Sequence, residues 1–305
     1  MLHSGNIQKL AELMEKSARF ARTSIDRAAL EFGPTWSAEL DTMLGNLYVS
    51  EDAMSAAVKG YGSFVIDSMR RQKRFEVERF YPAKTYAEAA AEVYLNDDYM
   101  ARQYLPGLLL SHYLWIHHFQ QIKYFKIFFL ESLAASHVSN FAEVGVGTGI
   151  YSRLALESLS GVQGVGFDIS PLSLQFTQQH VNAYGFGDRY SVLLQNILTA
   201  PPERKFQAVI CVEVLEHLED PVELLRGLKA MLAPGGKLFV TAALNAAHAD
   251  HIYLYREPAE VMAQVAEVGL HIENSFFSNA YMPDKKGVPV PAALAMVLSS
   301  ERDIS

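Results

Sequence analysis

The chain has little of several features that would indicate a particular compartment or partner. Its 305 residues include a single cysteine, Cys211, so an internal disulfide and a thiolate metal cluster are both excluded. Basic residues are outnumbered, because 26 Lys and Arg face 34 Asp and Glu and the formal net charge is −8. Nucleic-acid binding normally draws on clustered basic side chains, so no nucleic-acid partner is expected.

Long apolar runs are also missing. Residues 1–16 lack the apolar segment of a signal peptide, which predicts a cytoplasmic protein. The most apolar stretch, residues 105–130, is interrupted by His, Gln and Lys, so no membrane span is expected. His112, His117 and His118 within it lack the i, i+4 spacing that places two imidazoles on one helix face. No metal site is therefore expected.

The pattern of apolar residues changes near residue 135. Before it, apolar residues recur at helical spacing, which predicts an all-helical domain over residues 1–135. After it, short apolar runs alternate with amphipathic segments, which predicts an α/β domain with a mostly parallel sheet over residues 136–305. The expected strands are residues 138–146, 162–168, 190–195, 207–213 and 236–242. Breaks between the early helices are expected at residues 33–36, Tyr81-Pro82 and Pro106-Gly107.

The stretch FAEVGVGTGIY, residues 141–151, places three alternate glycines where the first strand turns into a helix. Small residues at such a turn let a ligand approach the backbone amides. A dinucleotide fingerprint would need its third glycine at position 150, which is Ile150. Asp168 closes the next apolar run, where a carboxylate can accept from both hydroxyls of a ribose. Glu143 would repel a pyrophosphate but not an ammonium or sulfonium, so the loop is predicted to hold a cationic nucleoside.

Three further segments follow in order: Asn196-Ile197, VICVEVLEHLEDP at 209–221 and LAPGGKLFV at 232–240. Together with the glycine loop they resemble the class I S-adenosylmethionine-dependent methyltransferases, especially the subgroup of ubiquinone and menaquinone biosynthesis, over residues 136–300. The resemblance implies a Rossmann-like sheet that ends in an antiparallel hairpin, here residues 271–277 and 291–298.

The resemblance implies S-adenosyl-L-methionine as the cofactor. Asp168 would bind the ribose, Glu143 would hold the amino group through a short hydrogen-bond chain, and Ile169 would pack on the adenine. Asn196 stands where many relatives have Asp, which weakens the adenine assignment at that position. The full set expected at the cofactor is Glu143, Gly145, Gly147, Gly149, Asp168, Ile169, Asn196, Ile197 and Glu213.

A catalytic base has to come from outside the glycine loop, since a sulfonium methyl is already a strong electrophile. His251 is the first candidate, because it follows the fifth strand in a segment that resembles the acceptor-pocket segment of many relatives. Its pKa is expected near 6 to 7, the ordinary range for histidine (about 6.5). Glu216 and His217 are the second candidates. An ordinary surface position is an equally good interpretation of His251. Glu216 and His217 could instead have a structural role in bracing the loop.

The expected function is methyl transfer to a small, mainly apolar metabolite, in small-molecule biosynthesis or secondary metabolism. Oxygen is the preferred acceptor atom and carbon stays open. Glu213-Val214-Leu215-Glu216 stands where amino-methylating relatives often carry Asn-Pro-Pro or Asp-Pro-Pro before an aromatic residue. An inactive scaffold of the same fold and a nicotinamide-dependent oxidoreductase are the alternatives.

The helical domain is expected to cap the acceptor or to form a homodimer. Residues 112–129 carry many aromatic rings, which would line an apolar pocket or simply belong to a buried helix between two domains. One basic run, Arg70, Arg71, Lys73 and Arg74, would dock an acidic carrier domain or form a solvated helix face.

Overall fold

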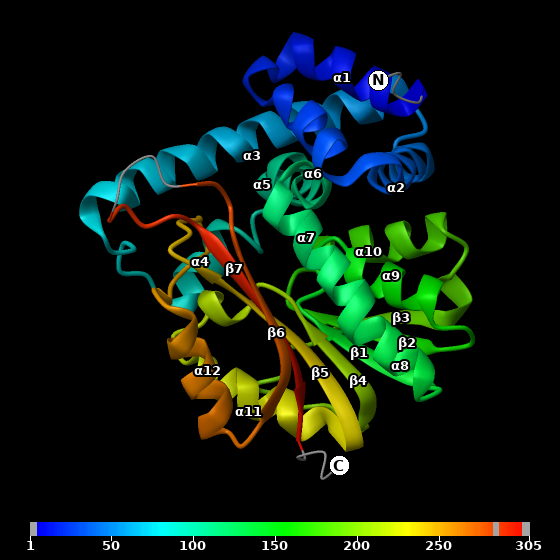
Figure 1. Ribbon diagram of the computed structural model, residues 1–305, viewed down its shortest axis with the longest axis vertical. Coiled ribbons are helices and arrows are strands. Elements are labelled where there is room, and N and C mark those ends of the chain that lie inside the picture. Colours follow the sequence, from blue (N-terminus) through cyan, green and yellow to red (C-terminus); the bar gives the residue numbers. More distant parts are fainter. Residues whose placement is uncertain (1–4, 283–286, 301–305) are drawn as a thin grey trace.

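The computed structural model describes residues 5–282 and 287–300. Residues 1–4, 283–286 and 301–305 of the two expected domains lie outside this part. The described strands form one seven-stranded sheet in the order β3-β2-β1-β4-β5-β7-β6 (Figure 1). Their bounds are β1 (Asn140–Val144), β2 (Gln163–Asp168), β3 (Tyr190–Leu194), β4 (Phe206–Cys211), β5 (Leu232–Leu244), β6 (His271–Asn279) and β7 (Ala292–Ser299).

Helices precede the sheet in the chain and also connect its strands. The early helices are α1 (Gly5–Ser17), η1 (Arg19–Ala21), α2 (Thr23–Leu47), α3 (Glu51–Glu78), α4 (Tyr86–Glu92), α5 (Asp97–Tyr99), η2 (Met100–Tyr104), α6 (Leu105–Leu114), α7 (Ile116–Tyr124), η3 (Phe125–Leu130) and α8 (Glu131–Ala135). The later ones are α9 (Ile150–Ser158), α10 (Pro171–Ala183), η4 (Gly187–Arg189), η5 (Leu215–His217), α11 (Pro221–Met231) and α12 (Pro258–Glu267).

The sheet has the direction pattern expected from the sequence. Strands β1 to β5 pair in parallel, whereas β7 lies between β5 and β6 and is antiparallel to both. The expected fold class and the final hairpin are thereby confirmed. Because the first five strands are parallel, their carboxyl ends meet at one edge of the sheet, where ligands bind in folds of this kind.

Alternate side chains of a strand point to opposite faces of the sheet, and each face packs in a different hydrophobic core. Ala208, Ile210 and Phe239 pack with the early helices, whereas Val209 and Val240 pack with α11 and α12 on the other face. One continuous core therefore joins the early helices to the sheet. The structure contains the expected helices, and the division into independent domains at residue 135 stays a prediction.

Two of the expected helix breaks lie where the sequence places them, and one expected break is wrong. Gly33, with φ of 68°, kinks α2, and Tyr81-Pro82 lies between α3 and α4. Pro106-Gly107 instead lies in the first turn of α6, which continues directly from η2. A Cβ at Gly107 would come within 2.4 Å of the Phe64 side chain, so this glycine serves the close packing of α6 on α3.

Residues 112–129 do not form a single helix. Trp115 is extended, with φ of −98° and ψ of 123°, and it separates α6 from α7. Its indole donates to Tyr61 Oη at 3.2 Å, a contact from outside the segment. No helix in the described part of the chain is both long and apolar enough to cross a membrane.

Candidate active site

The three glycines of the loop after β1 all have positive φ, of 72° at Gly145, 49° at Gly147 and 71° at Gly149. Their surroundings differ. A Cβ at Gly145 would come within 2.6 Å of Val214, and one at Gly149 within 2.7 Å of Thr177 on α10. A Cβ at Gly147 would meet only Leu108, at 3.6 Å. Gly149 therefore serves helix packing, and Gly147 is the glycine with open space beside it.

Two carboxyl groups flank this loop, of which Glu143 is buried and Asp168 is half-buried. Asp168, at the end of β2, accepts from the backbone N–H of Ser170 at 2.8 Å and of Gly147 at 3.3 Å. Burial raises the pKa of Asp168 to about 6. Glu143, on β1, accepts from the Ser152 N–H at 2.9 Å and from the Ser152 hydroxyl. Burial raises the pKa of Glu143 to about 8, although the bonds from Ser152 oppose this shift.

The expected adenine contacts lie at the carboxyl ends of β2 and β3. Ile169 follows Asp168 directly, and Asn196 and Ile197 follow β3. Asn196 Oδ1 accepts from the Leu198 N–H at 2.9 Å, so its carbonyl oxygen shapes its own turn. All three residues line the same cavity as Asp168.

A single cavity of about 790 Å³ connects these groups with the early helices. Ten of the twelve residues expected at the site line it; Gly149 and Glu216 do not. The volume is within the range of small-molecule pockets (300–1,000 Å³). The early helices contribute Phe64, Leu108 and Trp115 to its wall, and Leu108 lies beside Gly147 of the glycine loop.

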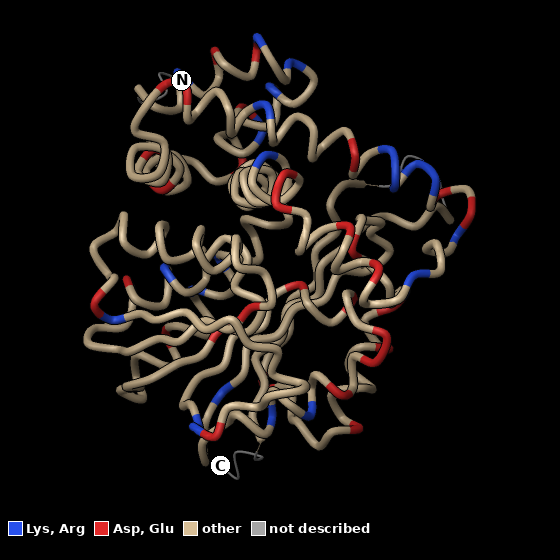
Figure 2. The backbone as a smooth tube through the Cα atoms, turned by 180° about the vertical axis from the view of Figure 1, so that it is seen from behind, with Lys and Arg blue, Asp and Glu red and all other residues tan. Residues whose placement is uncertain are grey.

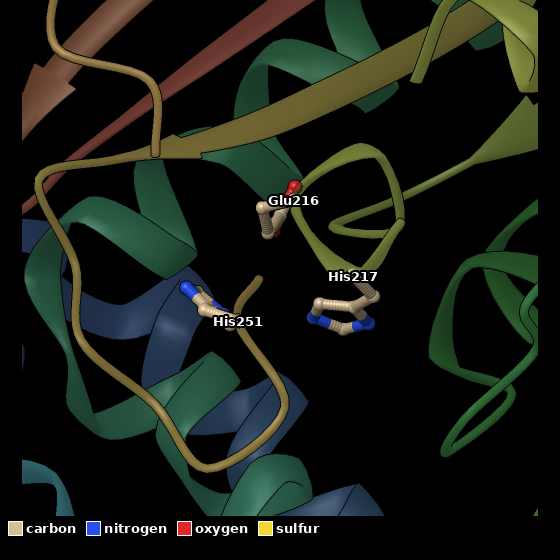
Figure 3. A group of neighbouring side chains, drawn as sticks. All are labelled: Glu216, His217 and His251. Carbon is tan, nitrogen blue, oxygen red and sulfur yellow. The ribbon is translucent and has the colours of Figure 1, made fainter. Parts of the chain in front are cut away.

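The catalytic candidates come together from two segments. Glu216 and His217 belong to η5 after β4, and His251 lies in the loop after β5 (Figure 3). His251 Nδ1 lies 2.7 Å from the carbonyl oxygen of Ala246, which makes Nδ1 the donor and leaves the Nε2 lone pair available. His217 and His251 line the cavity, with ring centroids 5.1 Å apart.

The sequence-based expectation that His251 titrates near pH 6 to 7 is wrong. Burial lowers its pKa well below the ordinary value, and the neighbouring His248 and His217 lower it further. The alternative of a surface position is wrong as well, because only 8% of His251 is exposed.

Glu216 is fully buried, and neither of its carboxylate oxygens has a hydrogen-bond partner of normal geometry in the described part of the chain. Burial raises its pKa well above the ordinary value, and the nearby Glu213 raises it further. Glu213 itself is anchored to β5, since its Oε1 accepts from the Thr241 hydroxyl at 2.7 Å.

Sequence reasoning missed a set of residues that support the histidines. Asp250 Oδ2 accepts from Tyr94 Oη at 2.9 Å and from Tyr104 Oη at 2.8 Å, and it lies 3.7 Å from His217 Nε2. Tyr94 Oη also lies 2.7 Å from His217 Nδ1. Burial alone would raise the pKa of Asp250, but the nearby histidines outweigh it and the pKa is lowered. No local motif relates the tyrosines to Asp250.

The remaining sequence-based hypotheses concern the early helices. His112 and His117 are buried, which lowers the pKa of His112 to about 4 and of His117 to about 3, so both are neutral at pH 7. In the basic run on α3, Arg71 pairs with Asp67 at 2.8 Å and Arg74 with Glu78 at 2.8 Å. Figure 2 shows Lys and Arg spread over the backbone with Asp and Glu among them.

The sheet order, the antiparallel last strand and the two acids beside a glycine loop are those of a class I methyltransferase fold. Residues 142–238 match the family model described as a methyltransferase domain. The matched segment and the fold together support a class I S-adenosylmethionine-dependent methyltransferase domain that resembles the ubiquinone-biosynthesis subgroup. Domains of this class use S-adenosylmethionine, so the cofactor expected from the sequence is confirmed.

Similar curated proteins include ubiquinone biosynthesis O-methyltransferases. The protein of Xanthomonas axonopodis pv. citri (strain 306) is 31% identical over 153 residues, covering 43% of this chain and 62% of the relative. The protein of Chromobacterium violaceum is 30% identical over 119 residues, covering 39% of this chain and 50% of the relative. The chain thus matches less than two thirds of the length of these relatives.

Two solved structures show a fold likeness that extends beyond the methyltransferase domain. An O-methyltransferase family protein from Burkholderia thailandensis has a TM-score of 0.54 at 12% identity, and mitomycin 7-O-methyltransferase MmcR has 0.51 at 14%. Each covers 79% of this chain and 71% of its own. A match of 79% is longer than residues 136–305, so the likeness includes part of the early helices.

Proposed function

We propose that this protein transfers the methyl group of S-adenosylmethionine to an oxygen of a small, mainly apolar metabolite. The observation that carries the proposal is the shared cavity, whose wall includes the glycine loop and Asp168 as well as His217 and His251. A cofactor at the glycine loop would then present its methyl group toward the histidines. The curated relatives at about 30% identity are O-methyltransferases by name, which supports oxygen.

Each residue expected at the cofactor has its own role in binding it. Asp168 accepts from the ribose hydroxyls, and Glu143 holds the cofactor's amino group. Ile169, Asn196 and Ile197 surround the adenine. Gly147 lets the cofactor approach the backbone, since nothing but Leu108 lies near its Cα hydrogen. These contacts align the sulfonium methyl with the acceptor, and such positioning accounts for most of the catalysis that a reactive methyl donor needs.

The acceptor end is largely apolar. Phe64 and Trp115 exclude water and favour a ring or alkyl body over a charged one. Its polar part is His217 and His251, which would act on the reacting oxygen, whereas Glu216 does not line the cavity and would support the two histidines. The early helices serve as the cap of this pocket.

The cofactor assignment is tested with Asp168→Ala. Losing a charge-assisted hydrogen bond costs about 1.5–3 kcal/mol, so the affinity for S-adenosylhomocysteine should fall at least about tenfold in calorimetric titration. Asp188→Ala, in η4 and outside the cavity lining, is the matched control. Equal affinity of the folded Asp168 variant and the control would remove Asp168 from the cofactor site.

The reaction is tested with methyl-labelled S-adenosylmethionine and a metabolite extract of the source organism. The labelled product is expected to carry its methyl on oxygen, which carbon NMR identifies from the chemical shift. A methyl on carbon would refute the acceptor atom but keep the methyl transfer. Absence of both S-adenosylhomocysteine binding and labelled product would refute the proposed function.

A further inference from the structure

The helices α6 and α7 contribute a second polar part to the cavity wall. His112 on α6 and His117 and Gln121 on α7 line the cavity, and all three side chains are buried. Nδ1 of each of these imidazoles and Oε1 of Gln121 have no hydrogen-bond partner in the described residues. Buried polar atoms in native structures are almost always paired. Three unpaired atoms in one part of a cavity wall therefore indicate a ligand that supplies the partners.

The amide of Gln121 keeps an unpaired atom in either orientation. Its Nε2 donates to Tyr151 Oη at 3.0 Å, which leaves Oε1 without a donor. If the amide were turned over, Oε1 would accept from Tyr151 and Nε2 would be the unpaired atom. One polar atom of Gln121 is thus available to a ligand in both cases.

The break between the two helices brings the histidines to one part of the wall. In a continuous helix, residues five positions apart, such as His112 and His117, point about 140° away from each other. The extended backbone of Trp115 removes this constraint. His118 then lies between the two, with its ring centroid 5.5 Å from that of His112 and 4.3 Å from that of His117. Rotation about the Cβ–Cγ bond of either imidazole can turn its unpaired nitrogen toward a bound group.

Aromatic rings connect this polar group with the histidine proposed to act on the reacting oxygen. The indole of Trp115 is stacked on His117, with ring centroids 5.8 Å apart and an interplanar angle of 20°. The ring of Trp115 lies 6.5 Å from that of His248, which lies 5.0 Å from that of His251. Side-chain rings of this kind pack well against another flat ring. A ring system lying along Trp115 and His248 would therefore extend from His251 to the polar group.

The polar group is uncharged at neutral pH. Burial lowers the pKa of His112 to about 4 and that of His117 to about 3, so both imidazoles are neutral at pH 7. A neutral imidazole offers one donor and one acceptor, as an amide also does on its two sides. An ionised carboxylate bound here would lose its hydration without gaining an opposite charge from these three residues, which is unfavourable. A hydroxyl or a carbonyl group fits the site better.

We propose that His112, His117 and Gln121 bind a second, uncharged oxygen substituent of the acceptor, either a hydroxyl or a carbonyl group. The acceptor is then a flat ring system with at least two oxygen substituents, one of which receives the methyl group near His217 and His251. This inference rests on the proposed function and deepens it, because it names the substrate class. The three residues bind and orient the acceptor and take no part in the transfer of the methyl group.

The test measures the binding of small naphthalenes to the full-length protein that already holds S-adenosylhomocysteine. The compounds are the two naphthols, the dihydroxynaphthalenes with one hydroxyl on each ring, and the hydroxynaphthoic acids that carry a carboxylate in place of the second hydroxyl. At least one dihydroxynaphthalene should bind about tenfold or more tightly than either naphthol, because the naphthols leave buried polar groups unpaired. The acids should bind no better than the naphthols. Calorimetric titration gives these affinities without turnover.

Three variants remove the polar atoms one residue at a time. His112→Phe and His117→Phe keep an aromatic ring, and Gln121→Met keeps the length of the side chain. Each should lower the preference for the second hydroxyl at least about threefold. His117→Gln, which retains a donor and an acceptor, should keep more of the preference than His117→Phe. His271→Phe, at the start of β6 and outside the cavity lining, is the matched control and should keep all of it.

The inference is overturned if no dihydroxynaphthalene binds more tightly than the naphthols, or if the folded variants keep the wild-type preference. A loss of affinity for S-adenosylhomocysteine in variants that circular dichroism shows to be folded would also overturn it, since the residues would then serve the cofactor. Wild-type protein that binds S-adenosylhomocysteine but does not discriminate among the naphthalenes would leave the proposed function standing. Wild-type protein that does not bind S-adenosylhomocysteine would refute the proposed function itself, so the two failures are distinguishable.

Discussion

Raising the pH from 6.5 to 7.5 should tighten the binding of S-adenosylhomocysteine, because Glu143 must lose its proton to hold the ligand's ammonium group. In the ligand-free protein, burial raises the pKa of Glu143 to about 8, so most molecules carry the neutral acid at pH 7. The negative charge of Asp168 adds to this shift, whereas hydrogen bonds from Ser152 reduce it. A bound ammonium group reverses the balance, since an opposite charge favours the ionised carboxylate.

The magnitude follows from that pKa. One pKa unit corresponds to 1.36 kcal/mol, so the cost of ionising Glu143 falls by about that amount per pH unit below 8. The affinity should therefore rise roughly tenfold between pH 6.5 and 7.5. Asp168, with a pKa of about 6, is largely ionised across this window and adds little. At still higher pH the ligand's own amino group loses its charge, and the affinity should fall again.

The assay is calorimetric titration in two buffers that differ in ionisation enthalpy, which counts the protons released on binding. About one proton should leave per ligand near pH 7. Glu143→Gln should bind more weakly at pH 8, with a flat pH profile and no proton release. Glu203→Gln, an exposed carboxyl before β4, is the control and should behave like the wild type. A flat profile in the wild type would refute the assignment of Glu143 to the ammonium group.

Two further predictions concern packing. Gly149→Ala should lower the free energy of unfolding by about 2–4 kcal/mol, because the new Cβ at positive φ would also come within 2.7 Å of Thr177. Gly161→Ala has a similar φ but nothing within 4 Å, so it should cost only about 1–2 kcal/mol; equal losses in denaturant unfolding would show that the clash is relieved. A chain starting at residue 131 should fail to fold as a soluble protein, because it lacks Phe125 and Phe129, whose rings lie 4.8 Å and 5.5 Å from that of Phe239. A soluble truncated chain with wild-type affinity for S-adenosylhomocysteine would contradict this.

The cofactor end of the site could be predicted from the sequence because its information is local. Glycine permits the positive φ that a tight turn uses, and all three glycines of the loop have it. Asp168 and Asn196 each end an apolar run, and the carboxyl ends of parallel strands necessarily meet at one edge of the sheet. The hairpin of β6 and β7 could be predicted from the resemblance to a known family. The bounds of β5 could not be predicted from the sequence.

The acceptor end was decided only by the tertiary structure. Trp115 interrupts a pattern that predicts one continuous helix, and its indole donates to Tyr61, which is far away in the sequence. Tyr94 and Tyr104 meet Asp250 across the boundary between the early helices and the sheet.

The protonation of the histidine group likewise depends on the fold. The residue type gives histidine a pKa near 6.5, but burial beside other imidazoles moves that of His251 far lower. Local sequence fixes backbone conformation and strand ends, because these depend on sterics between near neighbours. How deeply a side chain is buried, and which charged or polar groups lie next to it, depends on segments that only the folded chain brings together. Burial and these neighbours therefore decide which residues contact the acceptor.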